Sequence, residues 1–261
     1  MMAEGSDVWF RRFRRVARPR LRLVCLPHAG GSASTFRSWP QWLPEDVEVL
    51  AVNLPGRQDR LGEDCVSDMD RLADGVAEAL LPLSGEPFAL FGHSMGASVA
   101  FEVAHRLEQR YGTVAAALIV SGQQPPARYR VNEAHLGGDP GLLAEVRRLG
   151  GEGAAFLDSP EMRELLMPAI RGDFALMGAY RPDPSLRIAA PVDAWVGDAD
   201  VDVTVEETRA WAEVTTGPFA YRVFSGDHFY LNAQSAEFTG ALVERLARPE
   251  AKAGSAPHQV R

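Results

Sequence analysis

The string GHSMG at residues 92–96 has the residue types and spacing of a nucleophile. A serine flanked by glycines two positions away on each side is typical of a sharp turn between a strand and a helix, where the backbone is strained and closely packed. The apolar run Phe88–Phe91 precedes the string and the amphipathic stretch Met95–Arg110 follows it. We therefore predict Ser94 as a nucleophile at a helix N-terminus, where developing negative charge is stabilised.

A serine hydroxyl is a weak nucleophile unless a nearby base accepts its proton. His228 lies in the string SGDHF, directly after the apolar run Tyr221–Phe224. A predicted strand that ends just before a histidine would place the imidazole on the same edge of the sheet as Ser94. The remaining histidines lie in a predicted helix, in the long interval 121–191, beside the predicted nucleophile, in the glycine-rich string PHAGG or in the C-terminal tail, so His228 is the predicted general base.

The acid that orients this histidine should follow the preceding strand, because serine hydrolases of this kind have the chain order serine, acid, histidine. The run Val192–Val196 leads into GDADVD at residues 197–202. Asp198, Asp200 and Asp202 therefore compete for the role, and their spacing does not separate them. The chosen carboxylate would orient the imidazole and stabilise its protonated form.

Acyl transfer also needs donors for the oxyanion that forms on the carbonyl oxygen. The backbone N–H of Met95, directly after the serine, is one predicted donor. The other is expected from the glycine-rich string PHAGG at residues 27–31, after an early strand, with Ala29 as the donor. Each such donor typically lowers the barrier by ~3 kcal/mol. The Gly-Lys-Ser/Thr of a phosphate-binding P-loop is missing here.

Apolar runs without polar alternation alternate with amphipathic stretches, which predicts a parallel sheet covered on both faces. The predicted strands are Leu21–Leu26, Val47–Val52, Phe88–Phe91, Ala115–Val120, Val192–Val196 and Tyr221–Phe224, and the predicted helices are Arg71–Leu81, Met95–Arg110 and Val205–Val214. Together with the order of the candidate residues, this pattern predicts the α/β-hydrolase fold: a mostly parallel central sheet flanked by helices.

One interval interrupts this alternation. Residues 121–191 are too many for an ordinary connection, and apolar residues within them have helical spacing. We predict a helical lid over the sheet at approximately residues 122–187, within a single domain of residues 1–248. Phe174, Met177 and Phe229 are predicted to contact substrate. Residues 249–261 are expected to form a disordered tail.

Composition limits the other possibilities. The chain has 261 residues, of which 46% are hydrophobic and 24% charged, as is ordinary for a globular protein. Its net charge of −8 argues against nucleic-acid binding. No apolar run is long enough for a bilayer and no signal-peptide core is present, so we expect a cytoplasmic protein without membrane contact. Cys25 and Cys65 indicate neither a disulfide framework nor a metal site, and we expect no cofactor.

The charge is unevenly distributed along the chain. Residues 8–44 contain no acidic residue but include Arg11, Arg12 and Arg14 and several further arginines. Such a run is usually a solvated face, and the alternative is a docking surface for an acidic partner.

Taken together, the motifs resemble those of the type II thioesterases of polyketide and nonribosomal peptide assembly lines. The similar segments are WFRRF at 9–13, LPHAGGSA at 26–33, LPGRQDR at 54–60, GHSMG at 92–96, GDAD at 197–200 and GDHF at 226–229. The presence of both the PHAGG and the PGR strings is specific to this family among esterases. The chain departs from the family at Asp227, where glycine is frequent, and at Val201, where proline is frequent.

The resemblance implies that Asp200 is the acid, which completes a triad with Ser94 and His228. It implies hydrolysis of acyl thioesters from the phosphopantetheine arm of acyl or peptidyl carrier proteins, in order to clear stalled or wrong acyl groups. The phosphopantetheine would belong to the substrate, and the carrier proteins would be the partners. Because such carriers are acidic, the arginine run becomes a docking hypothesis.

Three other functions use the same residues. A stand-alone carboxylesterase would have the same triad and differ in substrate. An acyltransferase can contain Gly-His-Ser-x-Gly, but such enzymes lack an acid on a late strand and often have glutamate where Ala97 stands. An inactive interaction module is disfavoured because every required residue is present.

Overall fold

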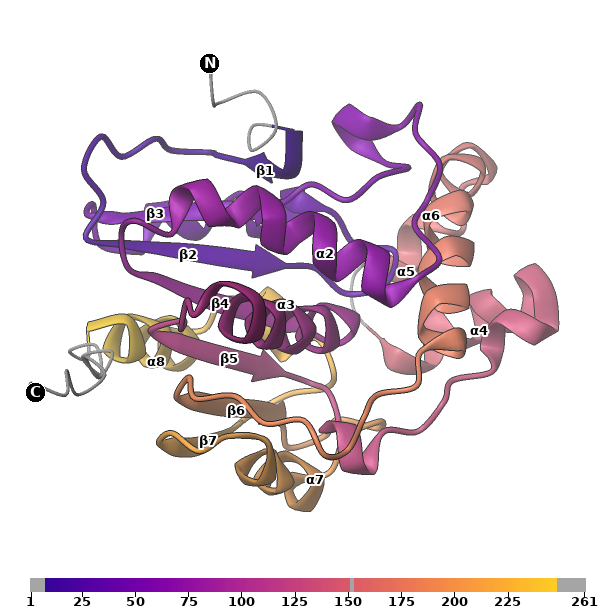
Figure 1. Cartoon of the computed structure of the whole chain (residues 1–261). Helices are drawn as coiled ribbons and strands as arrows, with labels where there is room; N and C mark the ends of the chain where they lie inside the picture. The colour runs from indigo at the N-terminus through magenta and orange to yellow at the C-terminus, as the bar shows by residue number, and fades with distance from the viewer. Residues whose placement is uncertain (1–7, 151–152, 248–261) are drawn as a thin grey trace, which may run out of the picture.

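The computed structural model describes residues 8–150 and 153–247 and contains a central sheet of seven strands (Figure 1). The strand order is β1-β3-β2-β4-β5-β6-β7, in which β1 pairs antiparallel with β3 and every other pair is parallel. The strands are β1 (Phe10–Arg11), β2 (Leu21–Leu26), β3 (Val47–Val52), β4 (Phe88–His93), β5 (Ala117–Ser121), β6 (Val192–Gly197) and β7 (Phe219–Phe224). All six predicted strands are present, and the predicted α/β-hydrolase fold is confirmed.

The continuous apolar runs form the inner strands because both of their faces are covered. Every residue of β3, β4, β5 and β6 is buried. The edge strand β7 is largely half-exposed, with only Phe224 buried. Since a half-exposed strand carries a weaker apolar signal, the prediction begins this strand two residues later than the structure does.

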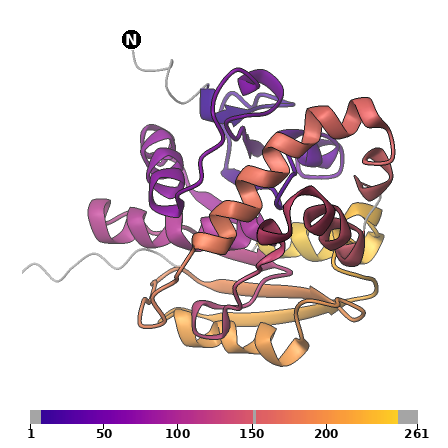
Figure 2. The ribbon, with the colours of Figure 1, turned by 90° about the vertical axis from the view of Figure 1, so that its right-hand side faces the viewer.

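Helices cover the two faces of the sheet with separate apolar cores (Figure 2). On one face lie α2 (Met69–Leu80) and α3 (Met95–Tyr111), together with the 3₁₀ turn η7 (Ala210–Val214). On the other lie α8 (Ala236–Ala247) and the 3₁₀ turns η1 (Ala33–Phe36) and η2 (Trp39–Gln41). The predicted helix Val205–Val214 is instead α7 (Val205–Arg209) followed by η7, a tightening that is common at helix C-termini.

Between β5 and β6 the chain forms helices beyond the carboxyl ends of the strands (Figures 1 and 2). They are η5 (Pro126–Arg128), η6 (Ala134–Gly137), α4 (Gly138–Leu149), α5 (Gly153–Phe156) and α6 (Pro160–Ala179). They share a small apolar cluster that consists of Leu142, Leu157, Met167, Ile170 and Phe174. We refer to the segment from η5 to α6 as the lid. The expected disordered tail, residues 249–261, lies outside the described residues.

Several arginines of the run make contacts near the edge of the sheet. Arg12 and Arg22 lie 3.5 and 3.2 Å from the Glu48 carboxylate, and Arg14 is half-buried and donates to the carbonyl oxygens of Pro40 and Pro44. Arg11 pairs with Asp59 at 3.3 Å. These contacts give the run a structural role, so charge reversal there would disturb the fold as well as any docking.

Two further expectations concern the cysteines and the membrane. Cys25 is fully buried, as its apolar surroundings predict, and Cys65 is partly exposed; both are free thiols. No helix in the described part of the chain is both long and apolar enough to cross a bilayer.

Candidate active site

Ser94 occupies a strained turn between β4 and α3. Its φ and ψ angles are 54° and −124°, a conformation that a non-glycine residue seldom adopts. A Cβ atom at position 92 would overlap the carbonyl oxygen of Gly96, and one at position 96 would overlap the carbonyl oxygen of Leu26. The Ser94 N–H donates to the Ser121 carbonyl at 2.8 Å, which ties the turn to β5. The two glycines are therefore required by close backbone contacts.

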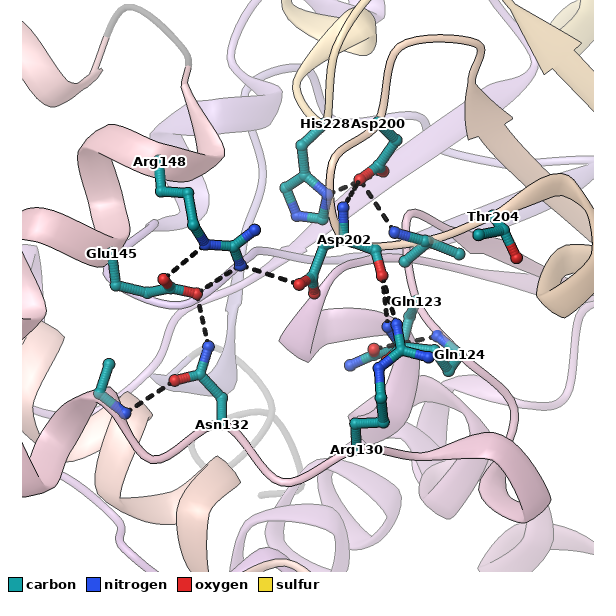
Figure 3. Close-up of polar contacts among 12 residues, drawn as sticks. Gln123, Gln124, Arg130, Asn132, Glu145, Arg148, Asp200, Asp202, Thr204 and His228 are labelled. Carbon is teal, nitrogen blue, oxygen red and sulfur yellow. Dashed lines mark hydrogen bonds and ion pairs between the residues drawn. The ribbon is translucent and has the colours of Figure 1, made fainter.

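His228 and Asp200 meet on the loops that follow β7 and β6 (Figure 3). His228 Nδ1 lies 2.9 Å from Asp200 Oδ2, and their side chains are only 1% and 0% exposed. The other oxygen of Asp200 accepts hydrogen bonds from the backbone N–H groups of Asp202 and Val203, at 2.8 and 3.1 Å. Burial raises the pKa of Asp200, but the hydrogen bond from His228 and these backbone bonds outweigh it, so the pKa is lowered overall.

The imidazole ring of His228 lies close to the turn that carries Ser94. The ring centroids of His228 and His93, the residue before Ser94, are 5.0 Å apart. The buried Nε2 atom has no hydrogen-bond partner among the described residues. A neutral imidazole whose Nδ1–H donates to a carboxylate presents Nε2 as a proton acceptor. The arrangement can thus take a proton from a hydroxyl at the turn.

The other aspartates near His228 have different partners. Asp198 accepts from the N–H of Gly226 at 2.9 Å, and Asp227 accepts from the N–H of Phe229 at 2.8 Å. Asp202 turns outward to Arg148, at 2.8 Å (Figure 3). The loop geometry therefore selects Asp200 from the aspartates that spacing alone left open.

The two predicted oxyanion donors lie on adjacent loops. Leu26 at the end of β2 pairs in register with Gly92 in β4, so the loops that leave these strands emerge side by side. Met95 is the first residue of α3, where a backbone N–H has no intrahelical acceptor. Ala29, Ser94 and Met95 line the same cavity.

This cavity has a volume of about 530 Å³ and lies between the sheet and the lid. The lid contributes most of its apolar wall: Leu149, Phe156, Leu157, Leu166, Ile170, Phe174 and Met177. The three residues predicted to contact substrate, Phe174, Met177 and Phe229, all line it. A largely apolar cavity with a few polar groups beside a nucleophile is suited to an acyl chain.

Polar residues that follow β5 also belong to the cavity, and the sequence prediction missed them. Gln123 and Gln124 line it, and the Gln123 side chain donates to Ser98 at 3.0 Å. The indole N–H of Trp211 donates to the Gln123 carbonyl at 2.8 Å, which fixes this segment. Polar residues directly after a buried strand are the signal that could have revealed them.

Two further histidines surround the base. Burial, together with the nearby His228 and Arg57, lowers the pKa of His28 to about 4. Burial, together with His228 and His28, also lowers the pKa of His93. The Nδ1 atom of His93 lies 2.9 Å from Ser121 Oγ, which in turn lies 2.7 Å from the Tyr230 hydroxyl. Both rings therefore stay neutral near pH 7 and add no competing positive charge.

An ion-pair network joins the lid to the acid loop (Figure 3). Arg148 of α4 bonds the Glu145 carboxylate at 2.7 Å as well as Asp202. Arg130 donates to the Asp202 carbonyl at 2.7 Å, and Asn132 donates to Glu145 at 2.6 Å. The loop that contains Asp200 is consequently held from the lid side.

Comparison with known proteins is consistent with this geometry. The Thioesterase domain family matches residues 21–248. "Thioesterase PikA5" of Streptomyces venezuelae is 43% identical over 242 residues, which cover 92% of this chain and 86% of that protein. Type II thioesterase BorB from the borrelidin biosynthetic cluster is 40% identical with a TM-score of 0.84, covering 92% and 98% of the two chains.

A further solved structure, YbtT, the type II thioesterase of the yersiniabactin NRPS/PKS pathway, is 30% identical with a TM-score of 0.77 and covers 91% and 97%. The matched region contains the turn at Ser94, the acid loop and the His228 loop. The resemblance inferred from the motifs is confirmed. The chain belongs to the thioesterase family and is a thioester hydrolase of the serine-hydrolase, α/β-hydrolase type.

Proposed function

We propose that this protein is a type II, editing thioesterase that hydrolyses stalled or wrong acyl groups from the phosphopantetheine arms of carrier proteins in polyketide or nonribosomal peptide biosynthesis. The observation that carries the proposal is the contact of His228 with Asp200 beside the strained turn at Ser94, under a lid with an apolar cavity. The similar solved structures BorB and YbtT are both named as type II thioesterases, which supports the proposal.

In the first half of the proposed reaction, Ser94 Oγ attacks the thioester carbonyl carbon. His228 Nε2 accepts the hydroxyl proton, and Asp200 stabilises the resulting imidazolium through Nδ1. The N–H groups of Ala29 and Met95 stabilise the oxyanion. The C–S bond then breaks, the proton passes from His228 to the leaving sulfur, and the phosphopantetheine thiol departs from an acyl-Ser94 ester.

The second half repeats the chemistry with water. His228 removes a proton from the water as its oxygen attacks the ester carbonyl, and the same donors stabilise the second oxyanion. Breakage of the C–O bond and transfer of the proton to Ser94 Oγ release the carboxylic acid and restore the enzyme. The reaction needs no group beyond the chain's own residues, because the phosphopantetheine arrives with the substrate.

The proposal assigns acyl and peptidyl carrier proteins as the partners and the cytoplasm as the site of action. The apolar lid wall would receive the acyl chain. The cavity's polar residues, among them Gln124 and Asn132, would face the arm, which is rich in amide groups. The relation to pathway thioesterases favours this function over a general carboxylesterase with the same triad.

The test is release of free thiol from an acyl-phosphopantetheinyl carrier protein, measured with a thiol reagent for the native protein and for Ser94→Ala. We expect rapid release by the native protein and a loss of at least about 10³-fold in the variant, because no other group replaces the nucleophile. Turnover of p-nitrophenyl esters serves as the comparison. Good ester turnover with little release from the carrier would favour the carboxylesterase.

A further inference from the structure

A buried ion pair joins the lid helix α6 to the loop that follows β3. Asp173 of α6 is 3% exposed and Arg57 is 7% exposed. The two side chains form a bidentate pair, with Nη1 to Oδ2 at 2.6 Å and Nη2 to Oδ1 at 2.7 Å. Bidentate pairing fixes the relative orientation of the two planar groups. Neither residue has a role in the proton transfers described above.

The same pair binds the loop that carries the second oxyanion donor. The backbone N–H of Gly30 donates to Asp173 Oδ2 at 2.7 Å. Arg57 Nη1 donates to the carbonyl oxygen of Gly31 at 3.0 Å. The first and the third peptide groups after Ala29 are thus held by side chains from elsewhere in the chain.

Packing strengthens this attachment. Gly30 has a φ of +76°, and a Cβ there would lie 2.8 Å from Ile170 Cγ1. Ile170 and Asp173 are three residues apart in α6, so they project from one face of the helix toward the loop. The backbone of the loop therefore packs directly against side chains of α6.

Charge explains why the arginine is needed. The carboxylate of Asp173 lies next to the loop where negative charge is expected to develop, and alone it would oppose that charge. Arg57 neutralises it, and Asp173 Oδ2 accepts hydrogen bonds from both Arg57 Nη1 and the Gly30 N–H. The pair can consequently hold the loop without an electrostatic penalty on the oxyanion.

We propose that Asp173 and Arg57 are positioning residues for the oxyanion hole, so that α6 both lines the acyl cavity and sets the direction of the Ala29 N–H. This rests on the proposed function, in which Ala29 is a donor. The peptide groups before and after Ala29 meet at its Cα. Fixing the Gly30 N–H therefore restricts the orientation of the Ala29 N–H.

The test compares Asp173→Asn and Arg57→Lys with the native protein on an acyl-N-acetylcysteamine thioester. We expect kcat to fall about 10–100-fold, because a displaced oxyanion donor loses transition-state stabilisation, while KM changes less than about threefold. A trifluoromethyl ketone, whose adduct with Ser94 places an oxyanion in the hole, should lose affinity in parallel with kcat. An acyl amide, which resembles only the ground state, should bind to the variants with the same affinity as to the native protein.

Asp139→Asn is the matched control. It breaks the Asp139–Arg171 pair, which is also bidentate, at 2.6 and 2.6 Å. This pair joins α6 to α4, is exposed, and neither of its side chains hydrogen-bonds the loop. We expect its kcat within about twofold of the native value. An equal loss of kcat in Asp139→Asn and Asp173→Asn would overturn the proposal.

Removing one partner leaves a buried charge and can prevent folding. The double variant Arg57→Met with Asp173→Leu removes both charges and should fold. The proposal requires its kcat to stay low, since the acceptor for the Gly30 N–H is lost; a native kcat would refute it. If the native protein cleaved small esters but not carrier-bound thioesters, the proposed function would fail, yet this comparison could still be made with ester substrates.

Discussion

The body and the lid of this protein are stabilised by different means. In the body, fully buried aromatic side chains pack on one another, as in the contact of Trp39 with Phe91, whose ring centroids are 4.9 Å apart. The apolar cluster of the lid is much smaller. The described lid joins the body through arginine–carboxylate pairs, among them Arg148–Asp202 and Arg57–Asp173, and through the end of α6, where Leu176 and Met177 enter the apolar core of the body.

The difference teaches which part of the site depends on which interactions. The proposed triad residues lie on loops that leave β4, β6 and β7, and β4 and β6 are fully buried, so packing of the sheet largely sets their geometry. The acyl cavity is closed by a segment whose attachments include charged side chains, several of them exposed. We therefore expect substitutions that destabilise the body to disturb the geometry of the triad, and substitutions at the lid contacts to change the shape of the cavity.

The largest expected effect tests the body. Asp200→Asn should lower kcat about 10⁴-fold, because an amide no longer stabilises the imidazolium or the required tautomer of His228. The unfolding midpoint in urea should change little by comparison. Asp198→Asn, whose side chain bonds Gly226 instead, is the control. Similar losses in both variants would contradict the assignment of Asp200.

The next largest effect compares the apolar core of the body with the small apolar cluster of the lid. Phe91→Ala should lower the free energy of unfolding by about 3–5 kcal/mol, as is typical for a large buried ring. Leu157→Ala, within the lid cluster, should shift the global urea midpoint less than half as far. It should instead speed hydrogen exchange in α4 and α6, because the lid can open locally. Equal global shifts would show that the lid and the body unfold together.

The smallest expected effect is a pH dependence of stability that arises from His28, at the junction between the body and the lid. His28 lines the cavity, and its pKa of about 4 is below the 6.5 of an unfolded histidine. The unfolded state therefore binds more protons between these values, so stability falls as pH falls. Because His28 as a residue keeps some exposure to solvent, we expect a loss of about 1–2 kcal/mol between pH 7.5 and 5. Urea titrations at both pH values should show a smaller loss of unfolding free energy in His28→Gln than in the native protein. An unchanged loss would argue against His28 as the source of the pH dependence.

Local signals in the sequence predicted much of the fold. The bounds of β2 and β3 agree with the predicted apolar runs, because strands buried on both faces are uniformly apolar. The strand β1 has only two residues, too few for any period. The helix α8 was not predicted, although Phe238, Leu242 and Leu246 are spaced four apart along it.

The site shows the same limit. Ser94 and His228 follow from local motifs, whereas the choice of Asp200 needed a family resemblance, because it depends on a turn that directs one carboxylate inward. The contact of Arg57 with Asp173 joins positions 116 residues apart and could not be read from spacing. Arg57 stood in a recognised motif, but its partner did not.

The pairing of Asp173 with Arg57 also bears on how acyl selectivity could be redesigned. A lid transplanted from a relative in place of residues 122–187 would bring its own residue at position 173 but leave Arg57, which precedes the nucleophile in the chain. A chimera that keeps a carboxylate at position 173 would still hold the oxyanion loop in place. A chimera that loses it would contain Arg57 as a buried, unpaired positive charge. The lid therefore cannot be exchanged as an independent segment, because Arg57 of the body has to match the lid residue at position 173.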